Sequence, residues 1–563
     1  MSCKEPNVIE GKAKFANYPQ VSGFRRVTMS PTGRFKLLSA IAMQRLGLLP
    51  LLLSLVAICE HIPAQSTKGT RPPLSAGMAN PILPGDHPDP TLVRIGNTYW
   101  MASTSGDWAP EFPLYRSTDL RHWTATGAVF PQTPEWASGS FWAPELVADQ
   151  GRVLVYYVGR KRDGPLCIAV ATAAHAEGPY TDHGPILCES DGSIDPSFVR
   201  DEHGQPFLIW KEDGNSEGKP TPIWAQPLSG DLLHLTGSKT QLLVNDPASW
   251  EGGVVEGPYI FRHAGRFYLF YAGNACCGTA CHYAEGVARA GHLFGPWEKD
   301  PANPIIRPNA AWKCPGHGTA VETPSGTDYF LYHAYPAVGT VYLGRESVLD
   351  RITWSTDGWP VINAGFGTGG GSLPGGTAPR QNSFIDEFQQ PLPDPEWKWP
   401  IRHAPAFHVG NGHLTLEAST NQTPVFLGRS LMAAAYVATV GVDATGDAEG
   451  SLGIIGGTRS ELVLAKHGGR LELWRVTGAA RDVLWRQEFA GRSMSWLRVS
   501  STGNAEATFS YSLDRKHWTN AGPAISLAGL PPWDQGLRIG LVSDGPAGTQ
   551  ATFVHFSLLD AKN

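Results

Sequence analysis

Five aromatic-rich runs recur along the chain, and this repeat constrains the fold more than any other feature. The runs are NTYWMAST, RVLVYYVG, QPFLIWKE, RFYLFYAG and DYFLYHAY, centred near Tyr99, Val155, Leu208, Leu269 and Leu331. Successive centres lie 56, 53, 61 and 62 residues apart, which leaves room for about four short strands in each unit. No stretch shows sustained helical periodicity. The repeat therefore predicts an all-β chain whose first part is a five-bladed β-propeller.

A short segment precedes each aromatic run and carries one ionisable residue. The segments are HPDPTLVR, WAPELVAD, SIDPSFVR, VEGPYIFR and GHGTAVET, and the residues are Asp89, Glu145, Asp195, Glu256 and His317. Equivalent positions of the blades approach one axis, so we expect these groups to meet in the mouth of the central channel. Any single Asp-Pro pair is also a good turn sequence. Five in register instead indicate a metal site, a catalytic site or both, because gathering buried charges is costly.

The motifs NPILPGDHPDPTLVRIGNTYWMAST, FWAPELV, SIDPSFV and VEGPYIF resemble those of glycoside hydrolase family 43, over roughly residues 80 to 362. The resemblance implies a five-bladed propeller that hydrolyses arabinose- or xylose-containing polysaccharides with inversion of configuration. It also implies that Asp89 is the general base that activates water and Glu256 the general acid. Asp195 would orient the acid and tune its pKa.

Further residues take roles from the same resemblance. Arg345, in LGRESV, matches an arginine that contacts the substrate, and His317, in CPGHG, matches a histidine near one structural Ca²⁺ in the channel. Trp142 and Glu145 would lie near the sugar, with their roles left open. Trp108 is either part of a sugar platform or an ordinary rim or core tryptophan. No organic cofactor is expected, and a single histidine is not by itself a recognisable calcium motif.

The carboxylates suit inverting hydrolysis. That reaction needs a protonated carboxyl and a carboxylate about 6.5–9.5 Å apart, so that water fits between them. A third carboxylate nearby should raise the pKa of the acid by charge repulsion. We therefore expect Asp195 to keep Glu256 protonated near neutral pH.

A second domain follows the propeller, which we assign to residues 76–365. FGTGGGSLPGGTAP, residues 366–379, is a Gly/Pro-rich linker, and alternating β segments then predict a β-sandwich over 380–563. Its opening, FIDEFQQPLPDPEWKW, is similar to that of the concanavalin-like sandwich attached to some family 43 enzymes. Such a sandwich can cap the active site and favour exo action, or it can be only a packed module. If this opening faces the propeller, Asp386, Trp397 and Trp399 are candidates for substrate contact.

The first 75 residues have the pattern of a leader. Basic residues precede the apolar run LGLLPLLLSLVAI, residues 46–58, and cleavage would follow Ala64. Met29 is a candidate for the true start, and the apolar run is too short to span a bilayer. We expect a secreted or periplasmic protein, with a retained signal anchor as the alternative.

Six cysteines lie beyond the leader, and an oxidising compartment favours disulfides over a zinc knuckle for them. We expect Cys167 to pair with Cys188, and further disulfides to form within a second group: Cys276, Cys277, Cys281 and Cys314.

These features predict an inverting glycosidase with an oligosaccharide or polysaccharide substrate. Exo-acting α-L-arabinofuranosidase or β-D-xylosidase is the leading hypothesis. An endo-acting α-1,5-arabinanase, which needs an open groove, and a non-catalytic glycan-binding propeller are the alternatives. A net charge of −6 and a pI near 6.3 give no general attraction to nucleic acids or anionic membranes.

Overall fold

The computed structural model describes residues 80–561, apart from residues 366, 370–382, 391–393, 419–423, 444–446, 458, 468 and 489–494. These residues belong to one compact unit, Arg71–Asn563. The predicted leader and most of the predicted linker lie outside the described residues. Helices in the described part are single turns: η1 (Asn215–Glu217), α1 (Thr340–Leu343) and η2 (Asn363–Gly365). None of them has the length and apolarity needed to cross a membrane.

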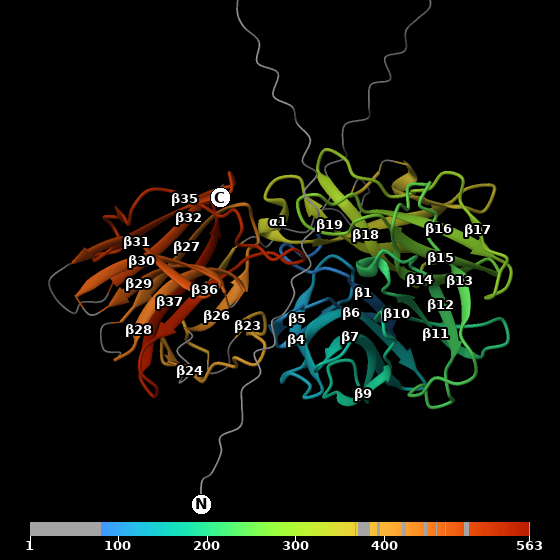
Figure 1. Cartoon of the computed structure of the whole chain (residues 1–563), viewed down its shortest axis with the longest axis horizontal. Helices are drawn as coiled ribbons and strands as arrows, with labels where there is room; N and C mark the ends of the chain where they lie inside the picture. The colour runs from blue at the N-terminus through green and yellow to red at the C-terminus, as the bar shows by residue number, and fades with distance from the viewer. Residues whose placement is uncertain are drawn as a thin grey trace, which may run out of the picture. The chain divides into compact units, whose positions relative to one another are not determined.

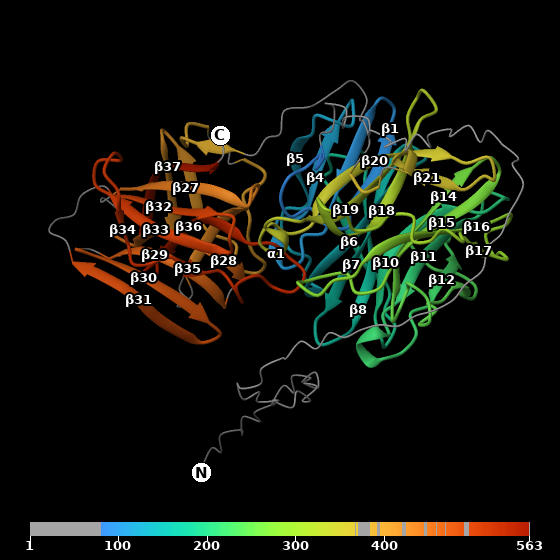
Figure 2. The ribbon, with the colours of Figure 1, turned by 90° about the horizontal axis from the view of Figure 1, so that it is seen from above.

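The first part of the described chain forms five antiparallel sheets of four strands each (Figures 1 and 2). The first sheet contains β1 (Thr91–Ile95), β2 (Thr98–Ala102), β4 (Glu111–Ser117) and β5 (Thr124–Phe130). The second contains β6 (Ala137–Asp149), β7 (Arg152–Lys161), β8 (Leu166–Ala173) and β9 (Thr181–Leu187). The third contains β10 (Ser193–Arg200), β11 (Pro206–Glu212), β12 (Ile223–Pro227) and β13 (Thr240–Leu243).

The last two sheets continue the pattern. The fourth contains β14 (Val255–His263), β15 (Arg266–Gly273), β16 (Ala284–Ala290) and β17 (Glu298–Lys299). The fifth contains β18 (Trp312–Glu322), β19 (Asp328–Pro336), β20 (Glu346–Trp354) and β21 (Pro360–Ile362). Each first strand contacts the first strands of both neighbouring sheets, and contact between β1 and β18 closes the ring. The five sheets are therefore the blades of a propeller, as the repeat predicts.

The aromatic runs are the second strands of the blades. Their side chains are buried almost continuously, as in β7 and β15, because both faces pack against neighbouring blades. The segment before β1 binds the fifth blade, where the Ile82 amide donates to the Ser347 carbonyl at 3.0 Å. The first and last blades are thus joined by hydrogen bonds as well as by packing.

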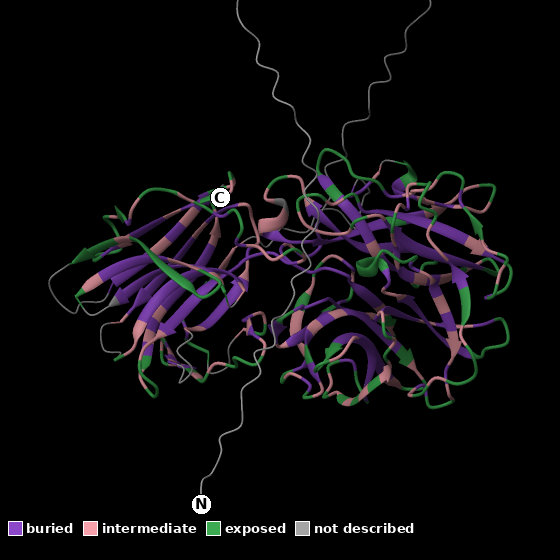
Figure 3. Ribbon diagram, viewed as in Figure 1, coloured by how far each residue is buried: buried purple, intermediate pink, exposed green. Residues whose placement is uncertain are grey.

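The second domain is a β-sandwich of two antiparallel sheets. One sheet contains β22 (Phe384–Asp386), β24 (Phe407–Gly410), β25 (His413–Glu417), β27 (Ala435–Val442), β32 (Ser495–Thr502), β33 (Glu506–Ser512), β34 (Thr519–Asn520), β35 (Ile525–Ser526) and β37 (Gln550–Asp560). The other contains β26 (Val425–Ser430), β28 (Glu449–Gly457), β29 (Ser460–His467), β30 (Arg470–Thr477), β31 (Ala480–Glu488) and β36 (Arg538–Asp544). Alternating side chains such as Leu414 and Leu416 are fully buried between them. Buried residues follow the strands and exposed ones gather in the loops (Figure 3).

A small sheet joins the propeller to the sandwich. Its strands are β3 (Trp108–Ala109), from the first blade, and β23 (Trp399–Pro400), from the predicted opening of the sandwich. The Lys398 ammonium group donates to the Pro110 carbonyl oxygen at 2.9 Å beside this pair. The sandwich opening therefore contacts the propeller directly.

Candidate active site

A break in the regular backbone positions the site residues. Register with the second strand is interrupted in the first strands of blades two to five. A residue with positive φ lies at each of these interruptions, and another lies just before β1: Asp89 (51°), Ala143 (44°), Asp195 (57°), Gly257 (57°) and His317 (51°). Such bulges bend a strand and re-aim its side chains, and they are frequent beside active sites. Asp89, Asp195 and His317 are placed by equivalent features in three blades.

Glu145 does not share this equivalence, contrary to the in-register arrangement that the sequence suggests. It follows Ala143 by two residues, whereas Glu256 precedes Gly257 by one. The Thr91 hydroxyl donates to Oε2 of Glu145 at 2.9 Å, and burial raises the pKa of Glu145 to about 8. Glu145 is thus a protonated link between inner strands, and its hydrogen bonds do not go to the other predicted site carboxylates.

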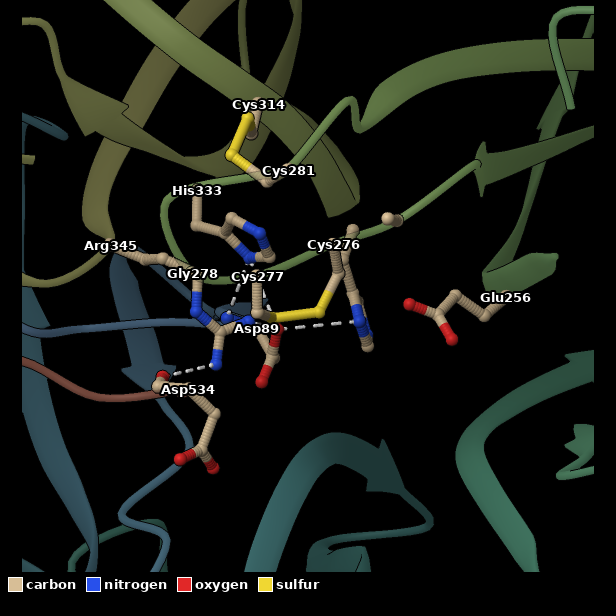
Figure 4. The surroundings of a disulfide bond; sticks show 12 residues. Asp89, Glu256, Cys276, Cys277, Gly278, Cys281, Cys314, His333, Arg345 and Asp534 are labelled. Carbon is tan, nitrogen blue, oxygen red and sulfur yellow. Dashed lines mark hydrogen bonds and ion pairs between the residues drawn. A yellow bond between two sulfur atoms is a disulfide. The ribbon is translucent and has the colours of Figure 1, made fainter. Parts of the chain in front are cut away.

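Asp89 lies at the centre of a buried polar cluster (Figure 4). Its Oδ1 accepts from Nη1 of Arg345 at 2.7 Å, and its Oδ2 accepts from the Thr104 hydroxyl at 2.7 Å. Nδ1 of His333 lies 3.1 Å from Oδ1 and accepts the Asp89 amide, and Nδ1 of His317 lies 3.5 Å away. Burial opposes ionisation, but the charge of Arg345, with a smaller contribution from His317, outweighs it and holds the pKa of Asp89 far below its usual value. Asp89 is therefore a carboxylate across the working pH range.

Asp195 and Glu256 form a second cluster with a buried lysine. The Gly257 amide donates to Oδ2 of Asp195 at 2.8 Å. Nζ of Lys211 donates to Oε2 of Glu256 and to Oδ1 of Asp213, both at 2.8 Å. Burial raises the pKa of Asp195 to about 6, with a further contribution from the charge of Glu256.

The prediction that Glu256 has a raised pKa is wrong. Burial favours protonation of Glu256, but the charge and the hydrogen bond of Lys211 outweigh it and lower its pKa. The sequence-based prediction considered only the negative charge of Asp195, which raises the pKa of Glu256. It omitted Lys211, which is 1% exposed and cationic and lowers that pKa. The proton of this carboxyl pair therefore resides mainly on Asp195 in the free protein.

Steric constraints require a glycine at position 257, in the VEGP motif. Gly257 has a φ of +57°, and a Cβ there would lie 2.8 Å from Cγ of His317. Any other residue would therefore push His317 away from Asp89 and strain the backbone. This explains why a glycine follows Glu256 in its strand.

The histidines do not form an evident calcium cage. Within the residues that the structure describes, no group of three or more His, Cys, Asp or Glu side chains could hold a metal ion. Ca²⁺ prefers six to eight oxygen ligands, whereas burial and Arg345 lower the pKa of His333 to about 4 and leave it a neutral nitrogen ligand beside His317. The protein side chains described do not fit the ion, and calcium stays a prediction.

A loop of the sandwich reaches the Asp89 cluster. Nη2 of Arg345 donates to the Asp534 carbonyl oxygen at 3.1 Å (Figure 4), and Nε2 of Gln535 donates to the Ser105 carbonyl oxygen at 3.0 Å. Trp533, on the same loop, is 62% exposed and meets Trp142 edge to face at 6.1 Å between ring centroids. Residues 533–535 thus bring the sandwich to the Asp89 cluster, a contact that the sequence did not predict.

Three of the tryptophans that the sequence suggested for sugar contact lie elsewhere in the structure. Trp108 is 2% exposed and packs on Phe426, with Arg538 over its ring, so its face is not open to a ligand. Trp397 is 2% exposed in the sandwich core, and Trp399 belongs to β23. Trp142 is half-buried and is the one of the four that contacts Trp533 of the sandwich loop.

Sequence reasoning missed two residues that a simple signal could have found. Lys211 and His333 both lie inside the apolar runs QPFLIWKE and DYFLYHAY, on second strands that are otherwise buried. An ionisable residue in such a strand needs a charged or hydrogen-bonding partner. Their partners are Glu256 and Asp89, the residues assigned as acid and base.

The fold and the site define the class of protein. The five-bladed propeller gathers an arginine-bound aspartate and a neighbouring, buried Asp–Glu pair. Residues 78–360, just over half of the chain, match the pattern of Glycosyl hydrolases family 43. The chain belongs to this family.

Similar proteins agree with this assignment. Xylosidase/arabinosidase 43B of Humicola insolens is 30% identical over 311 residues, covering 51% of this chain and 55% of that protein. A putative beta-xylosidase of Escherichia coli strain K12 is 29% identical over 322 residues, covering 51% and 57%. The chain thus aligns with little more than half the length of these curated relatives. The crystal structure of the GH43 BlXynB protein from Bacillus licheniformis has a TM-score of 0.70 at 22% identity, covering 86% of this chain and 99% of that one, so the two-domain fold is shared.

Proposed function

We propose that this protein is an exo-acting, inverting glycosidase that removes terminal α-L-arabinofuranosyl or β-D-xylosyl residues from plant cell-wall glycans. The observation that carries the proposal is the pair of buried clusters, an ionised Asp89 held by Arg345 and a carboxyl pair in which burial raises the pKa of Asp195 to about 6, so that this pair binds a proton in mildly acidic solution. Inverting hydrolysis needs one carboxylate and one proton donor. Relatives named as xylosidases and arabinosidases support pentoses as the sugars.

The residues divide the chemistry between them. Asp89 accepts a proton from the attacking water, and Arg345 keeps it ionised. In the free enzyme the proton resides on Asp195; it passes from Asp195 to Glu256, and Glu256 delivers it to the leaving oxygen. Lys211 sets the charge of the pair, since it binds Glu256 directly.

The sandwich loop supports exo action. Residues 533–535 bind Arg345 and Ser105 beside Asp89, so chain from the second domain occupies one side of the catalytic centre. A long polymer needs an open groove on both sides of the cleaved bond, whereas a chain end needs only a pocket. Replacing Trp533 with alanine should therefore raise KM for short oligosaccharides more than it lowers kcat.

We also propose an exported protein. The leader pattern and the cysteine pairs support an oxidising compartment. The structure joins Cys167 to Cys188, as predicted, and also joins Cys276 to Cys277 and Cys281 to Cys314.

The test is hydrolysis of 4-nitrophenyl α-L-arabinofuranoside, β-D-xyloside and β-D-galactoside, with Asp89→Asn as the control. We expect release from one of the pentosides and none from the galactoside, and loss of that release in the variant. If all three stay intact, debranched arabinan is the next substrate. Cleavage of that polymer into oligosaccharides would contradict exo action, and binding without cleavage would contradict the enzyme assignment.

A further inference from the structure

The loop of residues 274–283, here called the cystine loop, begins and ends beside Glu256. It joins β15 to β16, and Glu256 pairs in register with Ala272, two residues before the loop. Ala272 in turn pairs with Glu285, just after it. The last loop residue, Tyr283, is 1% exposed, and its hydroxyl helps to lower the pKa of Glu256. Both limbs of the loop therefore start at the acid side of the site.

The tip of the same loop reaches the base side. The Gly278 amide donates to the Tyr335 hydroxyl at 3.3 Å, and Tyr335 is close enough to Arg345 to interact with it electrostatically. A Cβ on Gly278 would lie 3.5 Å from the main-chain oxygen of Trp533. The cystine loop thus runs from Glu256 toward Arg345 and the sandwich loop, across the space between acid and base.

Two disulfides shape this loop, and they have different consequences. Cys281–Cys314 links the loop to β18, three residues before His317, and therefore fixes its second limb. Cys276–Cys277 joins adjacent residues and connects no separate segments. A cross-link that closes so small a ring removes little entropy from the unfolded chain. The Cys276–Cys277 disulfide therefore adds little to the stability of the whole protein, and its effect is on the conformation and surface of the loop tip.

The surface that this disulfide presents differs from its surroundings. Both cysteines are half-buried, and Cys276 packs against the buried cluster that contains Tyr283 and Tyr335. Figure 4 draws them in one view with Asp89, Arg345 and Glu256, all charged groups. A disulfide carries no charge and no hydrogen-bond donor, and its sulfur is polarisable like that of methionine, so it presents a soft apolar surface. Small-molecule sites combine such apolar surfaces with a few polar groups that fix orientation.

We propose that the Cys276–Cys277 disulfide is a substrate-contacting surface, the apolar wall against which the ring of the terminal pentose packs while the carboxylates face its scissile bond. This assignment rests on the proposed function, because it names the part of the same site that holds the sugar ring. The ligand class is a five-carbon sugar with an exposed C–H face. The oxidised pair is the binding form, because two separate thiols would not keep one rigid surface.

The first experiment compares the double variant Cys276→Ser/Cys277→Ser with wild type on the pentoside that wild type hydrolyses. We expect KM to rise about tenfold, equivalent to one contact of about 1.4 kcal/mol, with kcat within about threefold. The matched control is Cys167→Ser/Cys188→Ser, which removes a disulfide of the second blade and should leave KM unchanged. An unchanged KM in the first variant, or a loss confined to kcat, would overturn the proposal.

A second experiment needs no variant that could misfold. Folded wild-type enzyme is treated with a mild thiol reductant, and the reduced cysteines are alkylated and mapped by mass spectrometry. Reduction at Cys276 and Cys277 should raise KM by the same factor, and the Cys276→Ser/Cys277→Ser enzyme should not respond. If KM stays unchanged after Cys276 and Cys277 are reduced, the proposed contact between the disulfide and the sugar is refuted. Absence of any wild-type turnover would instead refute the proposed function, so the two failures are distinguishable.

Discussion

Replacing Arg345 with methionine removes the cation that holds the proposed base. Nη1 of Arg345 lies 2.7 Å from Oδ1 of Asp89, and the two residues are 4% and 7% exposed. Removing one partner of a buried ion pair costs about 3–5 kcal/mol, since the other charge is left unpaired. If that cost falls on the transition state, kcat/KM should drop by about 10²- to 10⁴-fold.

The pH profile separates this mechanism from a general loss of fold. Arg345 lowers the pKa of Asp89, whereas burial alone would raise it. The base must be ionised to act, so the acidic limb of the kcat/KM profile should move to higher pH in Arg345→Met. Arg345→Lys keeps the charge but not the two-pronged donation to Asp89 and Asp534, and should fall between wild type and Arg345→Met.

The assay is the initial rate on the preferred pentoside across the pH range, with thermal unfolding followed in parallel. Arg116→Met, at an exposed position of β4, is the matched control and should resemble wild type. An Arg345→Met enzyme that keeps more than about a tenth of wild-type kcat/KM, or an unmoved acidic limb, would refute the reasoning.

Three further outcomes follow from the same clusters. Asp89→Asn should abolish turnover of every substrate, and residual steady-state hydrolysis above the uncatalysed rate would remove it as the base. Glu256→Gln should slow natural glycosides far more than aryl glycosides, whose leaving groups need little protonation, and equal losses in kcat on both would contradict its role as acid. Lys211→Met should move the alkaline limb of kcat/KM to higher pH, because Lys211 lowers the pKa of both Asp195 and Glu256, and an unmoved limb would show that the pair is not the proton donor.

The propeller could be predicted because its sequence signal is local and repeated. Second strands that pack between two blades must be apolar on both faces, and this produces the aromatic runs. Once the number of blades is known, the ring must close between the first and last blades. The contact between β1 and β18 and the hydrogen bond from Ile82 to Ser347 follow from that closure.

The exact register of the inner strands could not be read from charge alone. The better marker is proline, because the positive-φ residue directly precedes one in four blades: Pro90, Pro144, Pro196 and Pro258. Aligned on these prolines, Glu145 is displaced by two residues from Asp89 and Asp195. Its separate hydrogen bond to Thr91 follows from that displacement.

Interactions between distant segments were beyond sequence reasoning. Lys211 and Glu256 are 45 residues apart, and Arg345 and Asp534 are 189 apart. The pKa of Glu256 depends on the first contact, and the second contact links the sandwich loop to Arg345. No local pattern in PPWDQG, which contains Asp534, or in QPFLIWKE, which contains Lys211, indicates which distant residue either one contacts.

The central claim is that Asp89 activates water while Glu256 protonates the leaving oxygen on the opposite side. Proton NMR of the sugar released in the first minutes of hydrolysis tests it most directly, since the first-formed anomer records the direction of attack. We predict that the new anomer has the opposite configuration to the glycoside, before mutarotation mixes the two. Initial release with retained configuration would require a covalent intermediate and would contradict the assignment.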